Sequence, residues 1–215
     1  MDFHLFYSSA VEKHFGHNDK RALGELKELI DQLESHTDLI TEVIISRVVD
    51  NFLCYVTDLL ALVYKQKPEM LRSSEQERVD FILLYDSMDD LRAALAEKRV
   101  EKLAYLGLRD LSEHLISQMN FGLFPDKGHL AKAALLVEYR NLLVHNRGIV
   151  SSTSVKRFPV LASQLGRRIA LTPQVVREYR KFLENAVFDI DLRASEKFAI
   201  PAIPIPAPPM DLVGD

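Results

Sequence analysis

Apolar residues recur at intervals of three and four along most of this chain, and this helical period constrains its fold more than any other feature. The clearest stretch covers residues 44–63, where the apolar positions form a wide stripe: Ile44, Ile45, Val48, Val49, Phe52, Tyr55, Val56, Leu59, Leu60 and Val63. Alternation at every second position, which is typical of strands, is almost absent. The sequence therefore predicts an all-α fold in which such stripes pack together as a helical bundle.

Residues that begin and end helices divide the first half of the chain. We expect a short helix over residues 3–15 and a second over 20–34, which contains Leu23, Leu26, Leu29, Ile30 and Leu33 at helical spacing. Thr37 or Thr41 would then cap a separate long helix that ends before Pro68. The run Ser73-Ser74-Glu75-Gln76-Glu77 predicts a capping box, which opens a helix through Tyr85.

In the second half, a long helical region is expected over residues 88–119, followed by a turn at 121–125. A helix over about 130–146 should end in a left-handed cap at Gly148. Residues 150–171 lack a clear period and predict a long loop. A last helix is expected to begin at Thr172-Pro173, with the threonine as its cap, and to continue to about Phe198.

The length of 215 residues suits one domain, which we place at residues 1–198, followed by a Pro-rich extended or disordered tail at 199–215. No apolar run approaches the roughly 18 residues of a membrane span, and the first residues do not resemble a signal peptide. The single cysteine, Cys54, rules out an intramolecular disulfide framework and is expected in the core. We therefore expect a cytoplasmic protein with no cofactor, no metal and no membrane contact.

Charge is unevenly distributed along the chain, although the net charge is only −4. Residues 139–181 contain nine Lys and Arg and a single acidic residue, Glu178, which gives this segment a formal charge of +8. The remainder of the chain is correspondingly acidic. A local basic region of this kind favours a surface that binds a polyanion, although a solvated basic face without a ligand would have the same composition.

The basic region contains the most specific string of the sequence, which runs from Glu138 to Val150 and reads Glu-Tyr-Arg-Asn-Leu-Leu-Val-His-Asn-Arg-Gly-Ile-Val. It resembles the signature of the HEPN superfamily, in which an Arg followed by a polar residue precedes a His near the end of a helix. The matching positions are Arg140, Asn141 and His145, with an Asn-x-Gly turn after the His. The rest of the chain resembles the family only in its helices.

This resemblance implies a HEPN-type bundle with two long antiparallel helices. It also implies a homodimer that cleaves RNA without a metal ion, as a toxin or phage-defence effector with a cognate antitoxin or defence-system partner. The implied catalytic residues are Arg140, Asn141 and His145. The residues expected to contact RNA are Glu138, Asn146, Arg147, Lys156 and Arg157. One branch of the family is modified on a Tyr two residues after the His, and Arg147 occupies that position here.

Helix geometry limits how these side chains can meet. Asn141 and His145 are four residues apart and share a helix face, with Glu138 on the same line. Arg140 and His145 are five residues apart, so a regular helix separates them by about 140° around its axis. Their convergence requires a bent helix end or a second copy of the motif. The alternative is a non-catalytic RNA-binding or dimerisation module, in which Arg140 and His145 specify helix packing.

Overall fold

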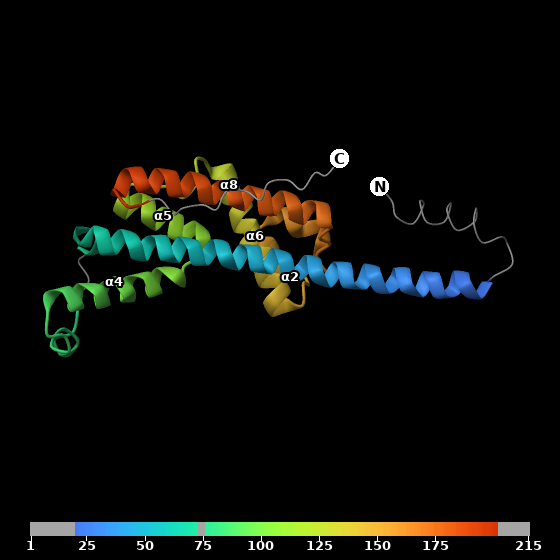
Figure 1. Cartoon of the computed structure of the whole chain (residues 1–215), viewed down its shortest axis with the longest axis horizontal. Helices are drawn as coiled ribbons and strands as arrows, with labels where there is room; N and C mark the ends of the chain where they lie inside the picture. The colour runs from blue at the N-terminus through green and yellow to red at the C-terminus, as the bar shows by residue number, and fades with distance from the viewer. Residues whose placement is uncertain (1–19, 73–75, 202–215) are drawn as a thin grey trace, which may run out of the picture.

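Helices account for all regular elements in the part of the chain that the computed structural model describes, residues 20–72 and 76–201. Figure 1 shows their arrangement, and the order is α2 (Lys20–Gln66), η1 (Pro68–Leu71), α3 (Val79–Ile82), α4 (Met88–Ala104), α5 (Leu108–Met119), α6 (Lys127–Asn146), α7 (Ser152–Arg157), η2 (Pro159–Gln164) and α8 (Pro173–Phe198). The predicted all-α class is confirmed. The helix expected at 3–15, most of the Pro-rich tail and the capping residues 73–75 lie outside the described residues.

The second half of α2 forms the axis of the main core. Its fully covered apolar residues are Ile45, Val49, Phe52, Val56, Leu59, Leu60 and Val63, against which α4, α6 and α8 pack. The longest helices, α2 and α8, lie side by side and run in the same direction, while α4 runs back along the end of α2 (Figure 1). The expected pair of long antiparallel helices is therefore not confirmed. Cys54, which was expected in the core, is exposed because it lies on the opposite face of α2.

The two helices predicted on either side of Thr37 form the single 47-residue helix α2. The Thr41 hydroxyl donates to the carbonyl of Thr37 at 2.6 Å, and Nδ1 of His36 lies 2.6 Å from the carbonyl oxygen of Gln32. The side chains of Thr41 and His36 thus bond to carbonyls of the preceding turn, as happens in the interior of a helix, and neither caps the start of a new helix. The prediction of a helix start at Thr37 or Thr41 was wrong for this reason.

Two further predicted elements differ in the structure. The region 88–119 is broken at Tyr105–Gly107 into α4 and α5, so that Leu103 and Leu108 can both enter the core. A continuous helix would place these two leucines about 140° apart. The helix expected through Tyr85 is reduced to the four residues of α3, whose first residue follows Arg78 without a side-chain cap.

The loop expected over residues 150–171 is largely structured. The hydroxyl of Ser151 accepts the amide of Ser154 at 3.1 Å and caps α7, and Pro159 begins η2. A second, smaller core lies beneath these elements, formed by Ala134, Leu142, Val150, Phe158, Leu161 and Ile169. The apolar residues of this segment are therefore spaced to cover one side of α6, a pattern that neither helical nor strand periodicity predicts.

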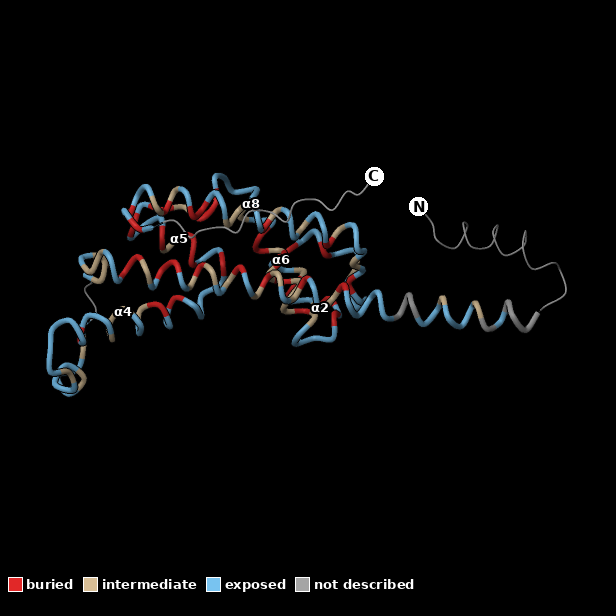
Figure 2. Tube along the Cα trace, viewed as in Figure 1, coloured by how far each residue is buried: buried red, intermediate tan, exposed pale blue. Residues whose placement is uncertain are grey.

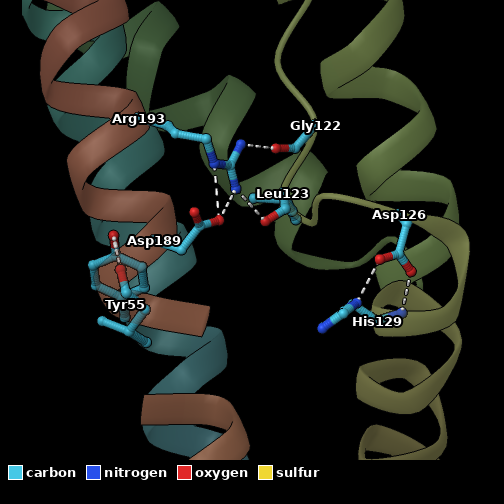
Figure 3. Close-up of polar contacts among 8 residues, drawn as sticks. Tyr55, Gly122, Leu123, Asp126, His129, Asp189 and Arg193 are labelled. Carbon is cyan, nitrogen blue, oxygen red and sulfur yellow. Dashed lines mark hydrogen bonds and ion pairs between the residues drawn. The ribbon is translucent and has the colours of Figure 1, made fainter. Parts of the chain in front are cut away.

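Arg193 fixes the turn that leads into α6 (Figure 3). Its guanidinium donates to the carbonyls of Gly122 and Leu123 at 2.5 and 2.9 Å, and its Nε donates to Asp189 of the same helix at 2.9 Å. The Asp126 carboxylate then accepts the amide of His129 at 2.9 Å and caps α6. These contacts tie the start of α6 to α8. No helix in the described part of the chain is long and apolar enough to cross a membrane.

Candidate functional site around the end of helix α6

The motif helix α6 ends immediately after His145 and Asn146. Arg147 adopts a left-handed conformation with φ of 53°, and Gly148 follows with φ of 75°. The amide of Gly148 donates to the carbonyl of Leu142 at 2.8 Å, which closes the helix end. The left-handed cap predicted at Gly148 thus begins one residue earlier. A side chain at Gly148 would also lie 3.1 Å from Cγ of Arg168, so both the positive φ and the nearby side chain favour glycine here.

Arg140 is tied to α2 through Asp50. Its Nε donates to Oδ1 of Asp50 at 2.7 Å, and its terminal nitrogen donates to Oδ1 of Asn141 at 3.3 Å. The side chains of Arg140 and Asp50 are 26% and 33% exposed, so the ion pair is largely withdrawn from solvent. Two of the five N–H donors of the guanidinium are used in these contacts. The arrangement holds Arg140 and Asn141 in a fixed relation at the surface of two packed helices.

Solvent exposure increases along the predicted row from Glu138 through Asn141 to His145. Glu138 is only 3% exposed, Asn141 is half-buried, and His145 is exposed in the last turn of α6. The Glu138 carboxylate lies 3.4 Å from the guanidinium of Arg157 in α7. Glu138 and Arg157, both expected to contact RNA, are therefore paired with each other, and the carboxylate faces the protein interior.

Arg140 and His145 are not brought together within one chain. The helix remains regular through Asn146, and the left-handed turn begins only at Arg147, beyond the histidine. Among the described residues no hydrogen bond or ion pair links Arg140 to His145. The bent helix end that could have joined them is absent from α6, which leaves a second copy of the motif as the route to convergence.

The basic segment is partly neutralised by acidic residues from outside it. Four of its arginines form ion pairs: Arg140 with Asp50, Arg157 with Glu138, Arg168 with Glu42, and Arg180 with Glu184. Arg147, Lys156 and Arg167 are exposed and form no ion pair with any residue that the structure describes. Arg147 lies in the turn that ends α6, and Lys156 lies on α7. Arg167 lies on the segment whose backbone pairs with Val150. Asn146, by contrast, donates its side-chain amide to the carbonyl of Ile149 and stabilises the turn.

A cavity of about 800 Å³ lies next to the end of the motif, between α2 and the segment that leads into α8. Its polar lining includes His36, Asp38, Glu42 and Arg168. The Arg168 guanidinium donates hydrogen bonds of 2.7 to 3.0 Å to the Glu42 carboxylate. Because two carboxylates and one already paired arginine line this cavity, it does not suit a phosphate. The described residues contain no cluster of three or more His, Cys, Asp or Glu that could hold a metal ion.

Tyr139, beside the motif arginine, packs against Tyr179 of α8 with ring centroids 6.2 Å apart. Burial, followed by the proximity of the Tyr179 phenol, raises the pKa of Tyr139 to about 12. The phenol therefore remains protonated near neutral pH and cannot act there as a base. It serves to pack α6 against α8.

Sequence reasoning missed two residues of α2 that belong to this surface. Asp50 is the partner of Arg140, yet it lies 90 residues earlier in the chain. Arg47 is exposed and lies one turn before Asp50, so the two side chains are neighbours on the helix surface, with Arg47 on the solvent side. Nothing in the local sequence around the motif indicates either residue. Both lie between members of the apolar stripe over residues 44–63, where charged residues are ordinary on a helix that has one buried face.

Comparison of the chain with protein-family models, with curated protein sequences and with solved structures finds no match.

Proposed function

We propose that this chain is a metal-independent endoribonuclease of the HEPN type, a toxin or phage-defence effector that acts as a homodimer. The observation that carries the proposal is the surface at the end of α6. There His145 is exposed, and Arg140 is held beside Asn141 by Asp50. Three unpaired basic side chains, Arg147, Lys156 and Arg167, follow on the adjoining segments and would hold flanking phosphates.

Exposed apolar residues beside the motif support a contact between two copies. Val144 is 51% exposed and immediately precedes His145, and Ile149 is 42% exposed just after the helix end. Exposed apolar side chains clustered around polar motif residues favour a covered interface. A two-fold axis near Val144 would bring both Arg140 and both His145 side chains to a shared cleft.

The proposed chemistry is transfer of the phosphodiester to the neighbouring ribose hydroxyl. One His145 removes the proton of the 2′-OH, the 2′-oxygen forms a bond to phosphorus, and the bond to the 5′-oxygen breaks. The second His145, in its protonated form, donates a proton to the departing 5′-oxygen. Arg140 stabilises the charge that develops on the non-bridging oxygens. The products are a 2′,3′-cyclic phosphate and a 5′-hydroxyl.

A non-catalytic helical module remains the second candidate because one observation favours it. The Arg140 guanidinium spans α6 and α2 through its 2.7 Å contact with Asp50, which is how a residue that fixes helix packing behaves. Under this alternative, the basic side chains bind RNA without cutting it. Replacing Arg140 would then lower stability and RNA affinity, and no cleavage would be found in the wild type.

The test is cleavage of a 5′-labelled RNA in excess chelator, with the purified full chain and four variants. We expect His145→Ala to reduce cleavage at least a hundredfold, and Arg140→Ala to reduce it strongly. His129→Ala, which alters an exposed histidine at the opposite end of α6, is the matched control and should cut normally. Lys156→Ala should weaken RNA binding with little effect on the rate of bound substrate. Cleavage that survives in His145→Ala, or that needs a divalent ion, overturns the proposal.

A further inference from the structure

The first half of α2 projects beyond the remaining helices, which begin to cover it only near the start of α8 (Figures 1 and 2). We call residues 20–44 of α2 the arm. Although Thr41 and Glu42 near its end meet the body within one chain, the surface of the arm is rich in exposed apolar side chains. Leu29, Leu39, Ile40 and Val43 are 53% to 59% exposed, and Ile44 is 41% exposed.

These residues follow the spacing of a coiled-coil seam. Leu26, Ile30, Thr37, Ile40 and Ile44 are separated by four, seven, three and four residues, and the sequence has leucine at position 33 to complete the series. Such spacing keeps the side chains on one face for several turns. Leu29 and Val43 widen this face at the adjoining position of the heptad. From Leu26 to Ile44 the seam is about 27 Å long.

The same face of α2 changes character where the body begins. Continued at heptad spacing into the second half of the helix, it consists of Arg47, Asn51, Cys54 and Asp58, all of which are exposed. A face that meets water along the body is therefore polar, whereas its continuation along the arm is apolar. This contrast indicates that the arm is covered by another helix in the assembled protein.

We propose that the occupant is the arm of a second copy of this chain, packed in the antiparallel direction. The seam is symmetrical about residue 35. Reversing it pairs Leu26 with Ile44 and Ile30 with Ile40 of the other copy, so apolar side chains meet toward both ends of the seam, while Thr37 faces position 33 near its middle. A two-fold contact requires such self-complementarity. The described charged residues of the arm, including Lys27, Glu28, Asp31 and Asp38, fall at positions outside the seam.

The surroundings of the seam suit an acidic partner helix. A groove of about 290 Å³ lies beside Ile40 and Ile44, with Pro173 and Val176 of α8 on its other wall and Arg177 and Arg180 at its edge. The antiparallel arrangement places Leu26 and Ile30 of the second copy at this groove. That segment carries Lys27 but also Glu28 and Asp31, and the sequence from 28 to 46 contains no Lys or Arg, so Glu28 and Asp31 would lie near the two arginines.

This contact is made by the arm and not by Val144 or Ile149, and it does not rest on the ribonuclease proposal. Pairing centred on residue 35 places the two bodies at opposite ends of the paired arms. Contacts at both surfaces would join more than two copies. The arm can therefore be tested without reference to RNA cleavage.

The first experiment measures self-association of the nuclease-treated full chain by sedimentation over a range of concentrations. We expect a concentration-dependent dimer, which Ile40→Asp or Leu29→Asp weakens at least tenfold. Both positions are more than half exposed, so helicity and melting of the body should be retained. Leu192→Asp, at a similarly exposed position on α8, is the control and should associate normally. Val144→Asp, next to His145, should also leave this dimer intact, because Val144 lies outside the arm. A wild-type monomer at all concentrations overturns the inference.

The second experiment tests direction and register by cross-linking in a Cys54→Ser background under mild oxidation. Ile30→Cys mixed with Ile40→Cys should form a disulfide between copies, whereas Ile30→Cys alone should not. Efficient cross-linking of Ile30→Cys with itself would indicate a parallel pair and refute the antiparallel contact. If deleting residues 1–19 is needed before any dimer forms, those residues are the occupant and the inference fails.

Discussion

Loss of the Asp50 carboxylate should destabilise the contact between α6 and α2. Asp50→Ala removes a charge-assisted hydrogen bond of 2.7 Å to Arg140, whose side chain is 26% exposed. Hydrogen bonds to charged groups contribute about 1.5–3 kcal/mol, and exposed ion pairs about 0.2–1 kcal/mol. Because this pair is about a quarter to a third exposed, we expect a loss of about 1.5 kcal/mol from the contact. Alanine favours the helix over aspartate by about 0.6 kcal/mol, so the net loss is about 1 kcal/mol.

A double-mutant cycle with Arg140→Ala separates these contributions, because the helix preference of residue 50 is the same in both backgrounds. The coupling free energy, measured by urea unfolding, should be about 1–1.5 kcal/mol. For a chain of this size the net loss in Asp50→Ala corresponds to a fall in Tm of about 2–4 °C. Asp58→Ala, at an exposed position two turns later on α2, is the matched control and should lose no stability. A coupling energy below about 0.3 kcal/mol would refute the argument that this pair links the helices.

Two further predictions concern the turn after the motif and the packing of α6 on α8. Gly148→Ala should lower the free energy of unfolding more than Gly166→Ala, measured by urea unfolding. Both glycines have positive φ, but only a side chain at Gly148 would meet Arg168. Equal losses of about 1 kcal/mol in the two variants would contradict the crowding at Gly148. The raised pKa of Tyr139, about 12, means that its protonated form contributes stability fully below pH 10. That contribution is lost as pH rises from 10 to 12, so Tyr139→Phe should show a shallower alkaline loss of stability than wild type, and parallel curves would contradict it.

The sequence predicted the helices that have strong local determinants. Thr172-Pro173 marks the start of α8, where the threonine hydroxyl accepts the amide of Val175 at 3.3 Å, and α8 ends at Phe198 as expected. The motif helix was likewise placed within a few residues of its observed ends. These boundaries follow from caps that act over three or four residues, so a local reading of the chain is sufficient to find them.

Features that depend on distant parts of the chain were missed. Thr41 is a good capping residue by type, but in a continuous helix its hydroxyl bonds to the preceding turn. The break between α4 and α5 follows from the need to bury Leu103 and Leu108 together, which only the packed core imposes. Asp50 is the plainest example, because its role depends on Arg140 meeting it across 90 residues of sequence. The candidate residues on α6 could therefore be named from the sequence, whereas their partner on α2 could not.

The continuity of α2 has a consequence for how its exposed half forms. Starting an isolated helix is unfavourable, since several residues must be ordered before the first hydrogen bond repays them, whereas extending one adds a bond for each residue fixed. Residues 45–64, held by the core, provide that nucleus, so the arm grows from it one residue at a time. Its helicity should decline smoothly toward Lys20 on warming, while the buried half melts only with the whole domain. Amide hydrogens of the arm should therefore exchange faster than those of residues 45–64. Pairing with the arm of a second copy would reduce this difference.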